Sequence, residues 1–237
     1  MPDIGKISVI IPAYNEAESI GEVISRSEAV LNKEGIDYEI VVIDSSVDDE
    51  TAKAAQSALG NSGRVIRRLC GQAGLSLSVL EGIKEAQGDT IIVMDADASH
   101  PPELIPEFTK SMRQGFELVI ASRYIQGSST AGFPLLRRII SRLGCLLGAM
   151  VTDIKDNTSG FFCIKKACLE GVSLRPCGFK IGLEIFVKAH YASHKEIPYL
   201  FTSRKKGRSK LNMTAGMQYL YQVLCLTFYK IGHSLKK

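Results

Sequence analysis

Residues 90–102 read TIIVMDADASHPP, and the interpretation of the whole chain starts from this stretch. Its first five residues are apolar or β-branched, which predicts a buried strand. The strand then runs into Asp95 and Asp97, separated only by Ala96. Carboxylates at the end of a buried strand predict a cation nearby, because a buried charge without a partner is costly. The alternative is a solvated turn in which an aspartate caps the helix that follows.

Outward from this stretch, apolar strands and amphipathic helices alternate along the first half of the chain. The first strand, in KISVIIPAYNE (6–16), is predicted to stop at Pro12, and the second, in YEIVVIDSSVDDET (38–51), ends in acids. Further strands are predicted at 63–69, 90–97 and 116–124, and helices at 16–34, 49–59, 74–87 and 101–115. This alternation predicts an α/β fold with a mostly parallel central sheet and helices on both faces. Ligands of such sheets bind beyond the carboxyl ends of the strands.

The second half of the chain has a different character. FPLLRRIISRLGCLLGAMV (133–151) predicts a long apolar helix with three arginines, and residues 180–192 predict a shorter helix. A strand is expected in NTSGFFCIKKACLEGV (157–172), and another runs into a basic loop in EIPYLFTSRKKGRSKLN (196–212). We expect residues 1–211 to form one domain and 212–237 a C-terminal amphipathic helix that associates with a membrane surface. The alternative for this last segment is a core helix packed on the domain.

The composition excludes some classes of protein. The 237 residues are enough for one large α/β domain, and a net charge of +4 is too small to indicate a nucleic-acid-binding protein. None of the six cysteines forms a CxxC pair, and Cys145, Cys163, Cys168 and Cys225 lie among apolar neighbours. We interpret these four as reduced core thiols of a cytoplasmic protein.

The acidic pair has the chemistry of a site for Mg²⁺ or Mn²⁺. Successive side chains of a strand point to opposite sides, so the turn after the strand must bring Asp95 and Asp97 to one ion. These ions prefer oxygen ligands, and two carboxylates leave most coordination positions for substrate phosphates. Ser99-His100-Pro101-Pro102 already supplies a turn and a helix start, which favours the metal site over a capping role.

Seven segments in this order resemble the family 2 glycosyltransferases, which have the GT-A fold. They are SVIIPAYNEAESI (8–20), YEIVVIDSSVDDET (38–51), GDTIIVMDADASHPPELIP (88–106), LVIASRYIQG (118–127), PLLRRIISRLG (134–144), DNTSGFFCIKKACLE (156–170) and SRKKGRSKL (203–211). The resemblance covers nearly the whole chain. It is closest to the branch of dolichyl-phosphate (polyprenyl-phosphate) mannose or glucose synthases.

The resemblance implies roles for individual residues. The nucleotide-sugar residues are Pro12, Tyr14, Glu16, Asp44, Asp95 and Lys210. The metal ligands are Asp95, Asp97 and Ser99, and the lipid-phosphate residues are Arg123, Arg137, Ser141 and Arg208. The residues expected to be most directly involved in catalysis are Asp97, Arg123 and Arg204. Arg204, Arg208 and Lys210 would belong to a basic loop that closes over the phosphates.

Elementary chemistry agrees with the acceptor assignment. Guanidinium groups bind phosphate in a bidentate, permanently charged way. Arg137 and Ser141 are four residues apart on a predicted helix and therefore share one face. The alternative for Arg137 and its neighbours Arg138 and Arg142 is a solvated helix edge or a contact with anionic lipid.

The implied reaction is metal-dependent transfer of mannose or glucose, with inversion, to a polyprenyl or dolichyl monophosphate. The donor would be a nucleotide diphosphate sugar, GDP-mannose or UDP-glucose. The acceptor phosphate is already ionised at neutral pH, so a strong general base is not required. Glu184 either orients a hydroxyl group or forms a structural ion pair. The expected location is the cytoplasmic face of a membrane, bound peripherally or through a membrane-protein subunit.

The donor side departs from the family pattern. Asp44-Ser45-Ser46-Val47 stands where relatives carry Asp-Asp-Gly-Ser, and Gln72-Ala73-Gly74-Leu75-Ser76 where they carry Lys-x-Gly-Leu-Gly. Ser45, Gln72 and Ser76 thus replace an acid, a cation and a glycine, which leaves the base and sugar of the donor open. Two other functions remain: a family 2 transferase with another sugar acceptor, and a catalytically weak scaffold subunit that binds nucleotide sugars.

Overall fold

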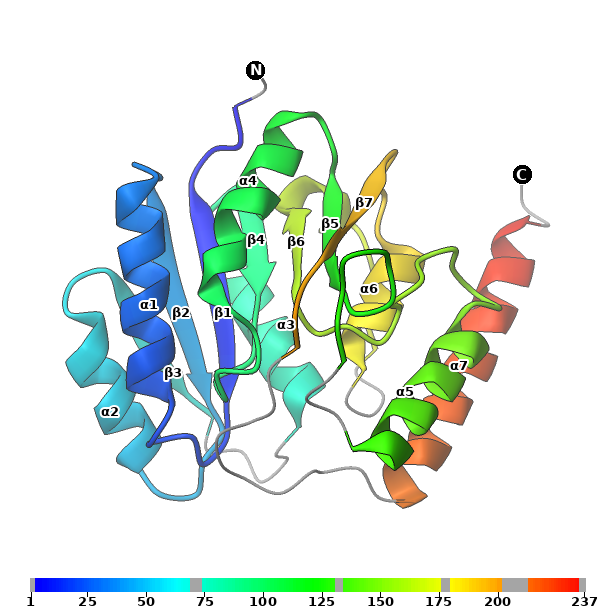
Figure 1. Ribbon diagram of the computed structural model, residues 1–237, viewed down its shortest axis with the longest axis horizontal. Helices are drawn as coiled ribbons and strands as arrows, with labels where there is room; N and C mark the ends of the chain where they lie inside the picture. The colour runs from blue at the N-terminus through cyan, green and yellow to red at the C-terminus, as the bar shows by residue number, and fades with distance from the viewer. Residues whose placement is uncertain (1–2, 69–73, 131–133, 176–179, 202–212, 235–237) are drawn as a thin grey trace.

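The computed structural model describes residues 3–68, 74–130, 134–175, 180–201 and 213–234. Within them, one sheet of seven strands has the order β3-β2-β1-β4-β6-β5-β7 (Figure 1). The strands are β1 (Ile7–Ala13), β2 (Tyr38–Asp44), β3 (Gly63–Arg67), β4 (Thr90–Val93), β5 (Leu118–Ser122), β6 (Phe162–Lys165) and β7 (His194–Pro198). Neighbouring strands are parallel except where β6 pairs with β4 and β5. The predicted α/β fold with a mostly parallel sheet is confirmed.

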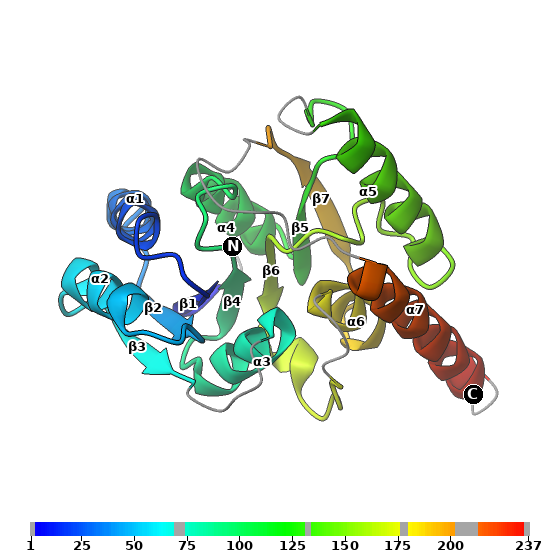
Figure 2. The same cartoon turned by 90° about the horizontal axis from the view of Figure 1, so that it is seen from below.

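Helices cover both faces of this sheet. On one face lie α1 (Ile20–Lys33), α2 (Glu50–Leu59) and α4 (Ile105–Arg113), the last preceded by the short helix η1 (Pro102–Leu104). On the other face lie α3 (Leu75–Glu85) and α6 (Ile181–Lys188), with η2 (Lys166–Leu169) beyond β6. The long helices α5 (Leu135–Gly148) and α7 (Met213–Ser234) lie side by side at the β7 end (Figures 1 and 2).

The hydrophobic core has two layers, one on each face of the sheet. Strand β1 supplies both: Val9 and Ile11 pack with α1 and α4, whereas Ile10 packs with α3. All three side chains are fully buried. Strands that are covered on both faces carry continuous apolar runs. This explains why apolar and polar residues do not alternate in the strand sequences.

The prediction that Pro12 stops the first strand is wrong. Strand β1 continues to Ala13, and Pro12 pairs in register with Ile43 of β2. The N–H and C=O of Ile10 and Pro12 point toward β4, since Ile10 O accepts a hydrogen bond from Met94 N. Strand β4 already ends at Val93, so the missing N–H of Pro12 faces no ladder partner.

The antiparallel strand β6 determines which segments meet at the carboxyl edge of the sheet. The chain enters β6 at the edge where β4 and β5 leave the sheet, because β6 runs against both. The segment 156–161, which precedes β6, therefore lies beside the turns that follow β4 and β5. Sequence patterns predicted a strand here but not its direction.

The C-terminal helix α7 packs on the domain through one stripe only. Tyr219, Val223 and Leu226 join Val151 and Leu183 in a small buried cluster. Cys225 lies outside this stripe and is exposed, so its assignment as a core thiol is wrong, whereas Cys145, Cys163 and Cys168 are buried as predicted. Among the described residues, α7 included, no helix has the length and apolar character needed to cross a bilayer.

Candidate active site

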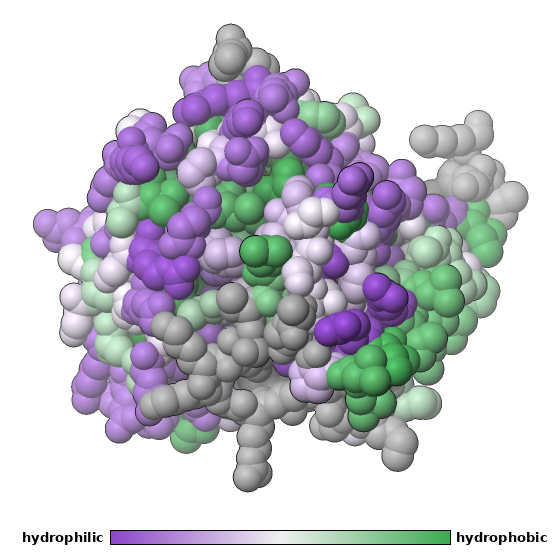
Figure 3. Space-filling model, in the orientation of Figure 1, coloured by the Kyte–Doolittle hydropathy of each residue, from purple (hydrophilic) through white to green (hydrophobic). Residues whose placement is uncertain are grey.

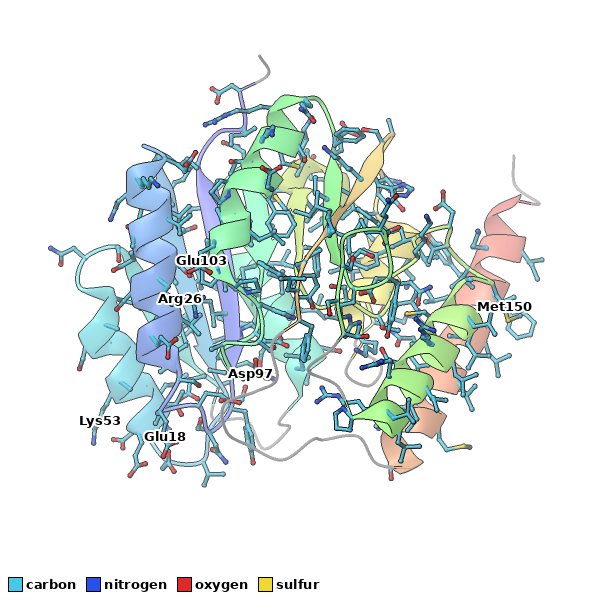
Figure 4. All side chains as sticks on the ribbon, in the orientation of Figure 1. Glu18, Arg26, Lys53, Asp97, Glu103 and Met150 are labelled. Atoms are coloured by element: carbon cyan, nitrogen blue, oxygen red, sulfur yellow. The ribbon has the colours of Figure 1, made fainter. Side chains whose placement is uncertain are left out.

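The turn after β4 presents the acidic pair at the carboxyl edge of the sheet. Asp97 is buried, with 6% of its surface exposed, and its Oδ1 accepts a hydrogen bond from Ser99 N at 3.0 Å. Ala98, between Asp97 and Ser99, has a φ of +60°. This left-handed conformation lets the chain turn sharply there. Asp95 is more open, with 27% of its side chain exposed. Figure 4 shows Asp97 at the lower edge of the sheet, where the strands end.

His100 holds this turn in place. Its Nδ1 accepts a hydrogen bond from Asp95 N at 2.9 Å, and its Nε2 lies 3.7 Å from Asp95 Oδ2. The imidazole stacks on Phe161 with ring centroids 4.9 Å apart. Gly160 approaches the same place so closely that a Cβ there would lie 3.7 Å from Asp95 Oδ1. The segment before β6 is thus in contact with the acidic turn.

The donor-side residues lie at the ends of β1 and β2. Asp44 is 1% exposed, and its Oδ1 accepts hydrogen bonds from Ser46 N at 2.9 Å and Ser46 Oγ at 2.5 Å. Its Oδ2 is buried without a hydrogen-bond partner among the described residues, and Arg67 Nε lies 3.8 Å away. Ser46 Oγ also accepts a hydrogen bond from Asn15 N at 2.8 Å, which fastens the loop after β1 to the loop after β2.

The other predicted donor-side residues lie in β1 and in the loop that follows it. Pro12 is buried within β1, Tyr14 is half-buried just beyond it, and Glu16 donates its N–H to Thr51 Oγ1 at 3.0 Å. Glu16 Oε2 accepts a hydrogen bond from Ser19 Oγ at 3.0 Å. At one of the departures from the family pattern, Ser45 Oγ lies 2.8 Å from Ser78 Oγ of α3. Gln72 lies outside the described residues.

Arg123 follows β5 and forms a buried ion pair with Asp156. Its Nε and Nη2 each donate to one carboxylate oxygen at 2.7 Å, and its backbone N donates at 2.8 Å. Burial alone would lower the pKa of Arg123 and raise that of Asp156, but the pair outweighs burial and keeps both charged. A fork of this geometry fixes the guanidinium plane. The family resemblance identified Arg123 but assigned no role to Asp156.

Lys180 is a second charged residue that sequence reasoning missed. It precedes α6, and its Nζ donates to Thr158 O at 2.8 Å. Burial, followed by the positive charge of Arg123, lowers the pKa of Lys180 to about 8, while Asp156 and Asp95 partly oppose the shift. The ammonium therefore lies within electrostatic reach of both the acidic turn and the Arg123–Asp156 pair. The only local clue was its place at the start of a predicted helix.

Helix α5 carries two of the predicted acceptor residues, Arg137 and Ser141. Arg137 Cζ lies 5.8 Å from the ring centroid of Phe201. Burial raises the pKa of Tyr124, and the Ser141 hydroxyl and the charge of Arg123 partly offset the shift, so these three groups are neighbours. Arg204, Arg208 and Lys210 lie outside the described residues, and their predicted roles remain predictions.

Glu184 has structural partners. On the first turn of α6 it is buried, and its Oε1 accepts hydrogen bonds from Arg175 N at 2.8 Å and Lys188 Nζ at 2.5 Å. These contacts favour the structural ion pair over the substrate-orienting role.

The donor set of the acidic turn fits a hard divalent ion. Asp95, Asp97 and Ser99 offer oxygen atoms only, whereas His100 Nδ1 is already used by a backbone N–H. In the part of the chain that the structure describes, no three His, Cys, Asp or Glu side chains are arranged to hold a metal by themselves. A metal here would therefore take several of its ligands from water and substrate, as Mg²⁺ commonly does at phosphate sites.

Comparison with protein families decides the assignment. The model of the family described as "Glycosyl transferase family 2" matches residues 8–172. The chain belongs to this family. The match spans β1 to η2 and includes the acidic turn, Arg123 and Asp156.

Three similar proteins share one description. A dolichol-phosphate mannosyltransferase of Pyrococcus furiosus is 40% identical over 92% of this chain, which spans 62% of that protein's length. Proteins of the same description from Mycosarcoma maydis and Saccharomyces cerevisiae are 34% and 32% identical over 95% of the chain, and 80% and 88% of their own lengths are covered.

Solved structures support the fold. Glucosyl-3-phosphoglycerate synthase of Mycobacterium tuberculosis, in complex with Mn²⁺, UDP and glucosyl-3-phosphoglycerate, has a TM-score of 0.68 at 22% identity, covering 96% of this chain and 80% of its own. Mannosyl-3-phosphoglycerate synthase of Rubrobacter xylanophilus has a TM-score of 0.69 at 16% identity, with coverages of 97% and 75%. The family 2 member described here thus has the GT-A fold of glycosyltransferases.

Proposed function

We propose that this family 2 glycosyltransferase transfers a hexose, mannose or glucose, from a nucleotide diphosphate sugar to a polyprenyl or dolichyl monophosphate. One observation carries the proposal. The segment 156–161 joins the acidic turn at Asp95 to the buried Arg123–Asp156 pair, so carboxylates and a guanidinium lie at one edge of the sheet. Relatives described as dolichol-phosphate mannosyltransferases support the lipid acceptor.

The donor would bind at the ends of β1, β2 and β4. Pro12, Tyr14, Glu16 and Asp44 would surround the nucleotide, and Asp95, Asp97 and Ser99 would hold Mg²⁺ or Mn²⁺ at the diphosphate. A bound divalent ion neutralises charge that develops on the leaving diphosphate. The Mn²⁺ and UDP named for the mycobacterial synthase support this arrangement. Lys210 and Arg204 would complete the donor side.

The acceptor phosphate would bind beside Arg123, Arg137, Ser141 and Arg208. Its oxygen is ionised near neutral pH and attacks the anomeric carbon from the face opposite the leaving group, which inverts that centre. Because no proton must be removed, the protein's contribution is alignment of the two substrates and stabilisation of charge. The pair with Asp156 holds the Arg123 guanidinium in a fixed plane for this purpose.

An apolar surface on α5 and α7 supports peripheral attachment to a membrane. The exposed apolar side chains are Leu135, Leu136, Ile139, Ile140, Leu143, Leu146 and Leu147 on α5, Met150 in the turn after it, and Met217, Leu220, Tyr221, Leu224, Phe228 and Ile231 on α7. Figure 3 shows part of this patch at the lower right. Extended apolar patches mark interaction surfaces. Because Arg137 and Ser141 lie on the same helix, docking α5 at a bilayer would bring them to the lipid phosphates.

The direct test is a transfer assay with purified protein, Mn²⁺ or Mg²⁺ and a short polyprenyl phosphate. GDP-mannose and UDP-glucose are each supplied as donor, and the expected product is the glycosyl lipid phosphate with the inverted anomeric configuration. Chelation by EDTA should abolish transfer, and the metal should restore it. Transfer to another sugar acceptor, or donor binding without any transfer, would contradict the proposal.

The membrane surface is tested by flotation with vesicles that contain anionic lipid. Leu143→Glu places a charge in the apolar patch and should abolish co-flotation. Gln56→Glu adds the same charge on the exposed surface of α2 and should have no effect. Equal flotation of both variants would show that α5 does not contact lipid. Wild-type protein that floats only with a co-purified membrane protein would indicate a subunit instead.

A further inference from the structure

Two buried tyrosine hydroxyls at the carboxyl edge of the sheet make no hydrogen bond within the part of the chain that the structure describes. Neither Tyr124 Oη nor Tyr199 Oη forms a hydrogen bond of accepted geometry with a described residue, although neither atom is accessible to solvent. The Ser141 hydroxyl is close enough to Tyr124 Oη to lower the pKa of that phenol, and Ser141 is itself assigned above to the acceptor phosphate. The hydroxyls of two other tyrosines do have partners: Tyr191 Oη donates to Phe186 O at 2.7 Å and Tyr219 Oη donates to Gly144 O at 2.8 Å. An unsatisfied buried hydroxyl is destabilising, so these two need a reason.

The sheet places both tyrosines beside Arg123. Strands β5 and β7 are parallel, and Ser122 pairs in register with Pro198, so the residues that follow them emerge side by side. Tyr199 N donates to Ser122 O at 3.3 Å, and Arg123 Cζ lies 5.6 Å from the centroid of the Tyr124 ring.

Tyr199 also contacts the acidic turn. Its ring meets the His100 ring edge-on at a centroid distance of 6.3 Å, and His100 in turn binds Asp95. Tyr199 therefore lies between the groups assigned above to the metal and those assigned to the acceptor phosphate. Tyr191 and Tyr219, whose hydroxyls are satisfied, do not occupy such a position.

The protonation state of the two hydroxyls restricts the kind of ligand that could bind them. Burial raises the pKa of both phenols above their ordinary value, so both keep their protons and act as hydrogen-bond donors at neutral pH. Two donors beside a guanidinium fit a ligand with several acceptor oxygens and negative charge, which describes a phosphate. Asp156 does not fill this role, because its oxygens already accept hydrogen bonds from Arg123.

We propose that Tyr124 and Tyr199 are the neutral hydrogen-bond donors of the acceptor-phosphate site and bind oxygens of the polyprenyl monophosphate next to Arg123. This assignment rests on the proposed function, which names the acceptor. Because both hydroxyls are covered in the structure, an incoming phosphate must displace the side chains over them. The opposing explanation is an ordered water molecule that satisfies each hydroxyl permanently.

The test removes one oxygen atom at a time. Tyr124→Phe, Tyr199→Phe and the control Tyr191→Phe are compared with wild type in two measurements: thermal unfolding without ligand, and calorimetric binding of citronellyl phosphate. Tyr124→Phe and Tyr199→Phe should unfold at or above the wild-type temperature and bind this short lipid phosphate about tenfold more weakly. Tyr191→Phe should unfold at a lower temperature, because it loses a satisfied hydrogen bond, and should bind with unchanged affinity.

Nucleotide binding distinguishes the phosphate of the lipid acceptor from the phosphates of the donor. If the hydroxyls serve the acceptor, the two variants should bind GDP or UDP, with Mn²⁺ present, as wild type does. Weaker nucleotide binding with unchanged binding of citronellyl phosphate would overturn the assignment. So would a Tyr199→Phe variant that is destabilised like Tyr191→Phe and binds citronellyl phosphate normally, because a water molecule would then satisfy the hydroxyl.

The inference and the proposed function fail in different ways. Wild-type protein that binds citronellyl phosphate through these hydroxyls but transfers no sugar would overturn the function and leave the site assignment standing. Normal transfer with unaffected tyrosine variants would overturn the assignment alone. Wild-type protein with no affinity for citronellyl phosphate would overturn both.

Discussion

The central sheet has an arginine–carboxylate pair at each edge, and the two pairs differ in burial and in surroundings: 34% of the Arg64 side chain is exposed, against 10% of the Arg123 side chain. At the amino edge, Glu39 accepts hydrogen bonds from Ser8 Oγ at 2.5 Å, Gln87 N at 2.6 Å and Arg64 Nη1 at 2.5 Å. Arg64 also donates to Glu85 O. At the carboxyl edge, the Arg123–Asp156 pair lies near Lys180 and near the hydroxyls of Tyr124 and Tyr199, which are buried without a hydrogen bond to any described residue.

The different surroundings of the two pairs indicate a structural network at the amino edge and a binding site at the carboxyl edge. At the amino edge the hydrogen bonds close on one another and tie β1, β2, β3 and the turn before β4 together. A network satisfied in this way stabilises one arrangement of the chain. At the carboxyl edge some donors lack partners, and charges lie close to each other. Groups left in that state are expected where a ligand completes the arrangement.

The largest expected effect comes from the acidic turn. Asp97→Asn keeps the oxygen that accepts the Ser99 N–H but removes the negative charge. Transfer activity should fall by about 10²–10³-fold, the size seen when a group that stabilises transition-state charge is lost. The unfolding temperature should change little. Glu39→Gln is the matched control at the other edge and should lower stability while leaving kcat unchanged. Retained activity in Asp97→Asn would refute the metal assignment.

The Arg123–Asp156 pair tests structure and function separately. Asp156→Asn leaves a buried guanidinium without its counter-charge and should lower the free energy of unfolding in urea by about 3–5 kcal/mol. The double variant Arg123→Met, Asp156→Leu removes both charges and should recover most of that stability, because an apolar pair of similar volume is tolerated. Its transfer activity should stay near zero. Recovered activity would mean that Arg123 serves the fold alone.

The amino-edge pair should control stability in acid. Burial raises the pKa of Glu39, but hydrogen bonds from Ser8, Gln87 and Arg64 outweigh burial and leave the pKa below its ordinary value. A carboxyl with a lowered folded pKa stabilises the protein above its unfolded pKa, about 4.3, and loses this contribution as pH falls through the folded pKa.

Glu39→Gln removes this contribution. The variant should be about 2 kcal/mol less stable than wild type at pH 7, since hydrogen bonds to a charged group are lost. The two stabilities should converge as pH falls from the unfolded pKa through the lowered folded pKa of Glu39. Urea titrations at several pH values measure both curves. Parallel curves would show that the charge of Glu39 does not contribute.

Sequence patterns predicted the part of the site that follows local rules. A strand that ends in acids, and an arginine and a serine four residues apart on a helix, are visible within a few residues. Asp156, Lys180 and Tyr199 were not predicted, because each owes its role to strands distant in the sequence. The direction of β6 decides the position of Asp156, and the pairing of β5 with β7 decides that of Tyr199. Hydrophobic patterns do not encode strand direction.

The smallest effect is expected where the chain departs from its family. Ser46 stands where the resemblance expects glycine, and its hydroxyl donates to Asp44 Oδ1 and accepts the Asn15 N–H. This bridge fixes one oxygen of Asp44 and leaves the other buried and unpaired among the described residues. Ser46→Ala should raise the KM for the donor by about fivefold, equivalent to about 1 kcal/mol of hydrogen bonding, with the acceptor KM unchanged.

Ser193→Ala removes a hydroxyl that donates to Gly115 O at 3.2 Å at the opposite edge and should change neither KM. A change in the acceptor KM of Ser46→Ala would mean that the loops after β1 and β2 serve the lipid side. An unchanged donor KM would mean that Asp44 does not depend on the bridge, and that the serine replaced the glycine without consequence for the donor. The expected split, a raised donor KM with an unchanged acceptor KM, would show that the Ser46 hydroxyl positions Asp44 for the donor by linking the loops after β1 and β2.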